Sequence, residues 1–207
     1  MPDKRQHRGC DPQDPRLFAD GHLESLRKAV GDLSWLLTRG YAEKSALKLV
    51  GDRYALAARQ RLAVRRCTCN DEELRWRAET RTTLDDAASR RLAIDGYNLL
   101  ITVEGALAGA PILVGRDGCL RDLAGIHGTY RRVAETQPAL ELIFRHVVAA
   151  GVRHVVSVWR TAPRGPARGG GRRLHEGVSA ATAAAVRREV AEGSVFSIRP
   201  AAIDRSR

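Results

Sequence analysis

Apolar residues recur at helical spacing through the first third of the chain. Between residues 22 and 37 they follow the i, i+3, i+4, i+7 pattern of an amphipathic helix: Leu23, Leu26, Val30, Leu33, Leu36 and Leu37. Gly40 suits a left-handed cap after this helix. Shorter helices are predicted at 42–50 and 57–66, and Asn70 begins another with acidic residues in its first turn. We therefore predict a helical module over residues 10–80.

The third predicted helix is strongly basic. Its arginines are placed outward by the pattern: Arg59, Arg61, Arg65 and Arg66. The predicted order is a helix, a short glycine-containing turn, a short helix and then a basic helix. This order resembles a helix-turn-helix layout. The alternative is an ordinary three-helix bundle with a solvated basic face, and the pattern leaves both open.

The next stretch, residues 90–160, alternates short β-rich runs with helical periods. Strands are expected at 92–94, within 109–114 and at 152–159, a turn at 115–118, and helices at 99–107, 119–133 and 139–149. Strands separated by helices predict a parallel sheet. The fold class expected from the sequence is therefore α/β, or α+β over the whole chain, with a Rossmann-like second module.

The composition changes at about residue 161. Leu, Ile, Val and Phe make up 8 of the 47 residues in 161–207, less than the ~20% below which a charged segment is expected to be disordered. This stretch is predicted to be a disordered, low-complexity basic tail. Two interpretations stay open, a flexible arm that binds nucleic acid and a degenerate or frame-shifted end.

Charge indicates the class of partner. The net charge is +11, with a pI of 10.3, although residues 151–207 alone carry +7. A polyanion, RNA or DNA, is the expected partner. The candidate phosphate contacts are Lys44, Lys48, Arg53, Arg59, Arg61 and Arg65.

Other features of the composition narrow the setting. No apolar run reaches the ~18–20 residues that span a bilayer, and no apolar stretch follows the charged N-terminus. We expect a cytoplasmic protein without a membrane partner, and no small-molecule cofactor is evident. The four cysteines are then expected to be free thiols.

One turn carries candidate chemistry. Asp95 follows a predicted strand, where parallel sheets place their sites, Gly96 permits a sharp turn, and Asn98 offers an amide oxygen. Such oxygens suit Mg²⁺ or Mn²⁺. A complete site needs further acids, and the candidates are Glu104, Asp117 and Asp122, with His127 as a proton carrier. Alternatively, Asp95 only caps the helix that follows.

Longer motifs resemble a known family. Four stretches of the helical part carry the resemblance: RLF at 16–18, DLSWLL at 32–37, RGYAEKSALKLVGDRY at 39–54 and RQR at 59–61. Together they are similar to the prokaryotic domain of unknown function 434. IDGYN at 94–98, GRDGCLRDL at 115–123 and HGTYR at 127–131 resemble the module that often follows it, which is itself similar to PIN and NYN nuclease domains. The resemblance covers residues 9–160.

The nuclease likeness implies a metal site, with catalytic roles for Asp95, Asn98 and Asp122. PIN-like sites need acids at later strand ends, but Arg160 follows the strand at 152–159, so the module resembles a truncated or degenerate copy. The sequence therefore predicts a nucleic-acid-binding, metal-dependent ribonuclease-like protein, active or inactive. The alternatives are a non-catalytic nucleic-acid-binding module and a regulatory protein-interaction module.

Overall fold

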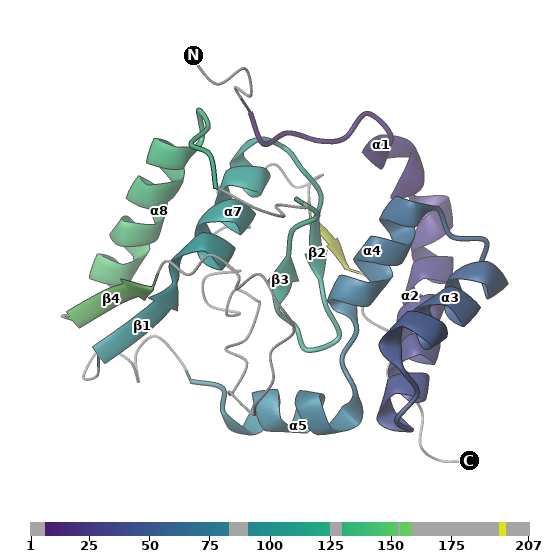
Figure 1. The fold of residues 1–207 in the computed structure, drawn as a ribbon. Coiled ribbons are helices and arrows are strands. Elements are labelled where there is room, and N and C mark those ends of the chain that lie inside the picture. The colour runs from purple at the N-terminus through teal and green to yellow at the C-terminus, as the bar shows by residue number, and fades with distance from the viewer. Residues whose placement is uncertain (1–6, 83–90, 125–129, 153, 159–194, 198–207) are drawn as a thin grey trace.

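A computed structural model describes residues 7–82, 91–124, 130–152, 154–158 and 195–197. It shows a mixed protein with a helical N-terminal part and short strands in small parallel and antiparallel sheets (Figure 1). His127 and most of the predicted tail lie outside the described residues. No helix within the described ranges combines the length and apolar character needed to cross a membrane.

The helical module contains α1 (Asp14–Leu17), α2 (Asp20–Thr38), α3 (Glu43–Arg53), α4 (Ala58–Cys67) and α5 (Asp71–Glu79). The apolar stripe of α2 faces a core that includes Leu26, Leu33 and Val64. Gly40 has the predicted left-handed conformation, at φ +80°. Asn70 caps α5 as predicted, because its side chain accepts the Glu73 N–H at 2.7 Å.

The second module begins with β1 (Arg91–Asp95) and α7 (Gly96–Leu107), followed by β2 (Ile112–Val114), β3 (Leu120–Arg121), α8 (Thr136–Ala149) and β4 (His154–Val158). β1 and β4 pair in parallel, as the sequence predicts, and their register places Asp95 opposite Val158. The helices α7 and α8 lie side by side near this pair (Figure 1). Their core includes Leu100, Val103 and Leu142.

A second small sheet has the strand order β3-β2-β5, where β5 is Val195–Ser197. β5 pairs in parallel with β2, although no strand was expected in the tail. β3 replaces the start of the helix predicted at 119–133. After the turn that contains Gly118 (φ +78°), the chain pairs back against β2 as an antiparallel strand. The spacing of three between Leu120 and Leu123 matches a helix rather than a strand, and pairing with β2 overrides that local preference.

The two modules share one core. Leu113 and Leu123 from the second module belong to the same buried cluster as Leu26 and Leu33 of α2. Figure 1 shows α4 lying between the strands β2 and β3 and the helices α2 and α3.

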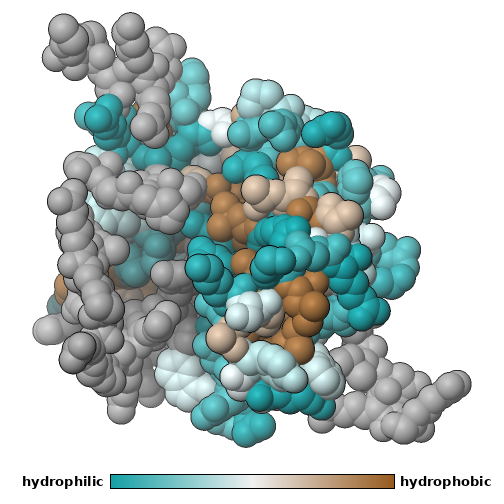
Figure 2. All heavy atoms as spheres, turned by 45° about the vertical axis from the view of Figure 1, so that its right-hand side comes forward, coloured by the Kyte–Doolittle hydropathy of each residue, from teal (hydrophilic) through white to brown (hydrophobic). Residues whose placement is uncertain are grey.

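The face of the molecule drawn in Figure 2 carries hydrophobic and hydrophilic side chains side by side rather than one continuous apolar surface.

The position of α4 bears on the helix-turn-helix interpretation. Arg59 and Arg66, predicted to face outward, reach the carbonyl oxygens of Leu123 and Asp122 in the second module. The outward placement of these two side chains is therefore wrong, because α4 is packed between two layers. A recognition helix must be free to enter a groove, so the structure favours the bundle over the helix-turn-helix interpretation.

Candidate functional site

The junction of β1 and α7 places Asp95 at the carboxyl end of a parallel strand. Its side chain caps α7, with the Asn98 backbone N–H donating to Oδ1 at 3.5 Å. The Asn98 side-chain amide also donates to Asp95 Oδ2, at 2.9 Å. Asp95 and Asn98 are half-buried. The predicted pair is therefore brought together, but each side chain satisfies the other, and the capping alternative describes what is seen.

Asp122 is linked to the same part of α7 through Thr102. The buried Thr102 hydroxyl lies 2.9 Å from the Asn98 carbonyl oxygen and 3.1 Å from Asp122 Oδ2. The other oxygen, Oδ1, accepts the Ala124 N–H at 2.8 Å and faces Arg66. Asp122 thus lies near the first turns of α7, yet its carboxylate is already engaged on both oxygens.

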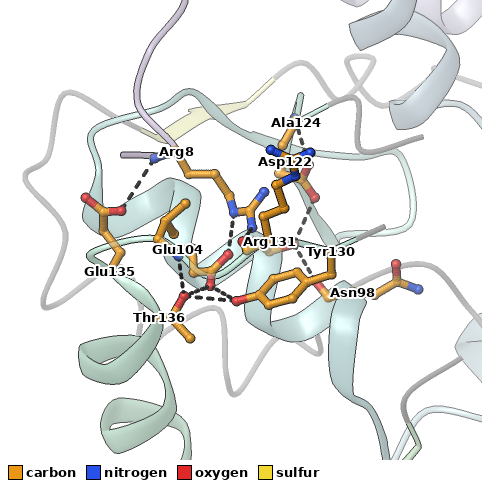
Figure 3. A network of polar contacts seen from close by, with 11 residues as sticks. Arg8, Asn98, Glu104, Asp122, Ala124, Tyr130, Arg131, Glu135 and Thr136 are labelled. Carbon is orange, nitrogen blue, oxygen red and sulfur yellow. Dashed lines mark hydrogen bonds and ion pairs between the residues drawn. The ribbon is translucent and has the colours of Figure 1, made fainter. Parts of the chain in front are cut away.

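Glu104 is fully buried and has its own set of partners within the network of polar contacts drawn in Figure 3. One oxygen accepts the hydroxyl groups of Tyr130 and Thr136, the latter at 2.6 Å, and the other accepts the guanidinium of Arg8. Arg8 also donates to the Arg131 carbonyl oxygen at 2.8 Å. Burial and the bond to Glu104 raise the pKa of Tyr130. Glu104 therefore anchors the N-terminal segment to the second module.

Asp117 lies in a third place, the turn between β2 and β3. Its side chain is 2% exposed and pairs with Arg77 and Arg121, each at 2.7 Å. Burial alone would raise the pKa of Asp117, but Arg121, the Cys119 N–H and Arg77 outweigh it and hold the pKa below its ordinary value. The carboxylate neutralises two arginines and has a structural role.

The predicted acids are therefore not gathered at one point. Asp95, Asn98 and Asp122 share one end of α7, Glu104 is bound to other partners further along the same helix, and Asp117 lies in a separate network. Across the described residues, no group of three or more His, Cys, Asp or Glu side chains is placed to hold a metal ion. Two carboxylates, those of Asp95 and Asp122, do not satisfy Mg²⁺ or Mn²⁺, so the described residues do not by themselves complete a site for either ion.

Most of the predicted phosphate contacts already have carboxylate partners. Lys48 pairs with Asp52 at 2.7 Å, and the exposed Arg53 and Arg65 face carboxylates at 3.7 and 3.8 Å. Arg59 is bound to the buried Asp14. Arg61 donates to Asp52 at 2.8 Å and lies so close to Gly51 that a Cβ there would collide with it.

Lys44 alone among the six predicted contacts has no carboxylate partner within the described structure. The other exposed cations of this kind are Arg16, Arg39, Arg75, Arg81 and Arg132. Four of these six cations belong to residues 35–44 and 70–81, which we call the α2–α5 corner. The two stretches meet where the Asp71 N–H donates to Thr38 Oγ1 at 3.0 Å. Arg39 and Lys44 lie on the α2–α3 side of this corner, and Arg75 and Arg81 lie on or just after α5, whose exposed acids are Glu72, Glu73 and Glu79.

The four cysteines are free thiols, as predicted. Burial raises the pKa of Cys67 to about 12 and that of Cys69 to about 11. A thiol with so high a pKa is a poor nucleophile at neutral pH. Cys67 ends α4 and contributes to the shared core.

Comparisons with known proteins give family names without an activity. Residues 25–79 match the family model described as "Protein of unknown function (DUF434)", and residues 84–161 match "Domain of unknown function (DUF5616)". An uncharacterized protein of Methanocaldococcus jannaschii is 29% identical over 132 residues. The alignment covers 64% of this chain and 64% of that relative. No solved structure matches.

Several residues of these networks were not predicted from the sequence. Thr102, Thr136 and Arg8 have no local signature, since their roles come from contacts with residues 20 to 96 positions away. Tyr130 lies within the HGTYR stretch, but its contact with Glu104 joins residues 26 positions apart. One contact of the α2–α5 corner could have been predicted from the sequence. Trp35 in the last turn of α2 and Arg39, its C-cap residue, are four residues apart, the spacing that lets side chains meet on a helix.

Proposed function

We propose that this protein binds nucleic acid through the α2–α5 corner. The observation that carries the proposal is the grouping of Arg39, Lys44, Arg75 and Arg81 without carboxylate partners among the described residues, in a chain of net charge +11. A cation that is free of protein carboxylates can neutralise phosphate and release counterions. A cation that is already paired must first break its bond, so it contributes less.

The salt dependence of binding tests this proposal. Full-length protein is titrated into a labelled 12-nucleotide RNA and into a duplex DNA at ~50 and ~200 mM salt. With three to four phosphate contacts, the affinity for RNA should fall by about 20- to 50-fold over this range. The test variant combines four substitutions, Arg39→Ala, Lys44→Ala, Arg75→Ala and Arg81→Ala. It should lose most of this dependence, because it lacks the cations that would release counterions.

A matched control replaces paired cations of the same module. Lys48→Ala with Arg53→Ala removes two exposed cations that face Asp52 and Asp32. This double variant should retain most of the wild-type affinity. If wild-type protein binds neither nucleic acid at ~50 mM salt, the proposed function is wrong.

A second candidate function is metal-dependent RNA cleavage by a PIN- or NYN-like second module. It is supported by the placement of Asp95 at the carboxyl end of β1, with Asn98 and Asp122 joined to the same part of α7. Added Mg²⁺ should then produce RNA cleavage that disappears with a chelator and in Asp95→Asn. Absence of cleavage in wild-type protein would remove this candidate and leave nucleic-acid binding as the function.

A further inference from the structure

Large aromatic side chains are exposed at the α2–α5 corner. Trp35 is 52% exposed, Tyr41 is 56% exposed and Trp76 on α5 is 42% exposed. The chain has only ten aromatic residues in Phe, Tyr and Trp together, so three exposed rings are a large share. Burying such a ring stabilises a fold by about 1.5–3 kcal/mol. A group of exposed rings therefore indicates a contact surface.

Trp35 and Arg39 form a stacked pair. The Arg39 guanidinium carbon lies 3.6 Å from the Trp35 ring centroid, and Arg39 Nη1 donates to the Trp35 carbonyl oxygen at 3.3 Å. The planar guanidinium keeps its remaining N–H groups available for phosphate or for a base edge. Stacking also fixes the arginine in one orientation, which lowers the entropy lost on binding.

Tyr41 is held near this pair by the turn after α2. Gly40 adopts φ +80°, and the Tyr41 N–H donates to the Leu36 carbonyl oxygen at 3.2 Å. The turn therefore fixes the backbone that carries an exposed ring, and Lys44 follows in the first turn of α3. Exposed aromatic rings and cations without carboxylate partners are the elements that bind single-stranded nucleic acid, with rings for bases and cations for phosphates.

We propose that Trp35, Arg39 and Tyr41 form a stacking platform for the bases of single-stranded nucleic acid. This inference rests on the proposed nucleic-acid binding and adds the form of the ligand and its contact residues. Bases inside a duplex are already stacked on one another, so only an unpaired strand offers free base faces to protein rings. Duplex DNA should therefore bind through its phosphates alone, and more weakly.

The acidic residues of α5 favour one path for the bound nucleic-acid strand across the corner. On α5, Glu72, Glu73 and Glu79 partly offset the positive charge of Arg75, whereas Arg39 and Lys44 lie on the α2–α3 side of the corner. The other carboxylate at the start of α3, Glu43, faces Arg65 at 3.8 Å. The phosphate backbone is therefore expected to follow the α2–α3 turn, with bases directed onto Trp35 and Tyr41.

The test is a binding titration of full-length protein with a labelled, non-self-complementary 12-nucleotide RNA, the same sequence as single-stranded DNA, and the DNA duplex, at ~50 mM salt. Trp35→Ala should weaken binding of both single strands by between about 5-fold and about 100-fold. Trp35→Phe, which keeps an aromatic face, should stay within about threefold of wild type. Duplex affinity should change by less than about twofold in either variant.

Phe144→Ala is the matched control, since Phe144 is also an exposed ring, 50% exposed, but lies on α8 in the other module. It should leave every affinity unchanged. If Trp35→Ala binds single strands as tightly as wild type does, the platform is wrong while the proposed binding stands. Wild-type protein that binds none of the three probes overturns both.

Discussion

Cations in two regions of this molecule have opposite surroundings. Between the modules, Arg59 is bound to the buried Asp14, and Arg66 reaches the carbonyl oxygen of Asp122 at 3.1 Å. At the α2–α5 corner, Arg39 and Lys44 are exposed and have no carboxylate partner in the described structure. The same residue types thus fasten the modules together in one place and leave positive charge available in the other.

This difference shows why net charge is a coarse guide to binding. An arginine that neutralises a buried carboxylate adds to the formal charge, but it has fewer N–H groups left for phosphate and cannot leave its partner without exposing a buried charge. A count of basic residues treats both kinds alike. The comparison predicts that breaking the buried pairs lowers the stability of the fold by a large amount. Replacing the exposed cations of the corner should instead weaken nucleic-acid binding and change stability little.

The largest effect on stability is expected at Glu104. Glu104→Ala leaves Arg8, Tyr130 and Thr136 without their buried acceptor, which should lower the free energy of unfolding by about 3–5 kcal/mol. Urea denaturation followed by circular dichroism measures this. The control, Glu24→Ala, removes an exposed pair with Lys28 and should change stability by less than about 1 kcal/mol. Equal effects of the two changes would contradict the distinction.

Asp117 should make stability depend on acid pH. Its folded-state pKa is lowered, so the stabilisation is present above the unfolded-state pKa of about 3.9 and is lost as the pH falls through the folded-state pKa. Asp117→Asn should be less stable than wild type at pH 7 by about 3 kcal/mol. Denaturation curves between pH 5 and pH 2 should converge, and curves that stay parallel would show that Asp117 does not cause the dependence.

Asp95 should have a smaller effect, because its bonds are those of a helix cap. Asp95→Ala is expected to lower the free energy of unfolding by about 1 kcal/mol, whereas Asp95→Asn keeps an acceptor and should lose only a few tenths. Thermal denaturation in the presence and absence of Mg²⁺ checks this. A wild-type melting temperature that rises with millimolar Mg²⁺, and no longer does so in Asp95→Ala, would point to a metal site that the cap conceals.

The sequence predicts local structure better than long-range contacts. The stripe on α2, the left-handed Gly40 and the Asn70 cap were all expected, because each depends on residues within one or two helical turns. The prediction of a helix at 119–133 was wrong at its start, where β3 pairs with β2. Pairing between strands is decided by the rest of the fold, which a local pattern does not contain.

The same limit explains what was foreseen at the candidate site. Asp95 and Asn98 are three residues apart, and their contact follows from the turn between β1 and α7. The partners of Glu104 and Asp117 include Arg8 and Arg77, at 96 and 40 residues' separation. Nothing in the local sequence indicates that these acids are neutralised by distant arginines rather than directed toward a shared ion.

Lys44 and Lys48 give the most direct test of the central claim, that unpaired cations at the α2–α5 corner bind phosphate. They lie on the same helix and are both exposed, but only Lys48 has a carboxylate partner, Asp52 at 2.7 Å. The measurement is the slope of log affinity against log salt for a 12-nucleotide RNA. Lys44→Ala should reduce the magnitude of this slope by about 0.7, the value for one contact to a single strand, and Lys48→Ala should leave it nearly unchanged. An unchanged slope in Lys44→Ala, or an equal reduction in both variants, would contradict the claim.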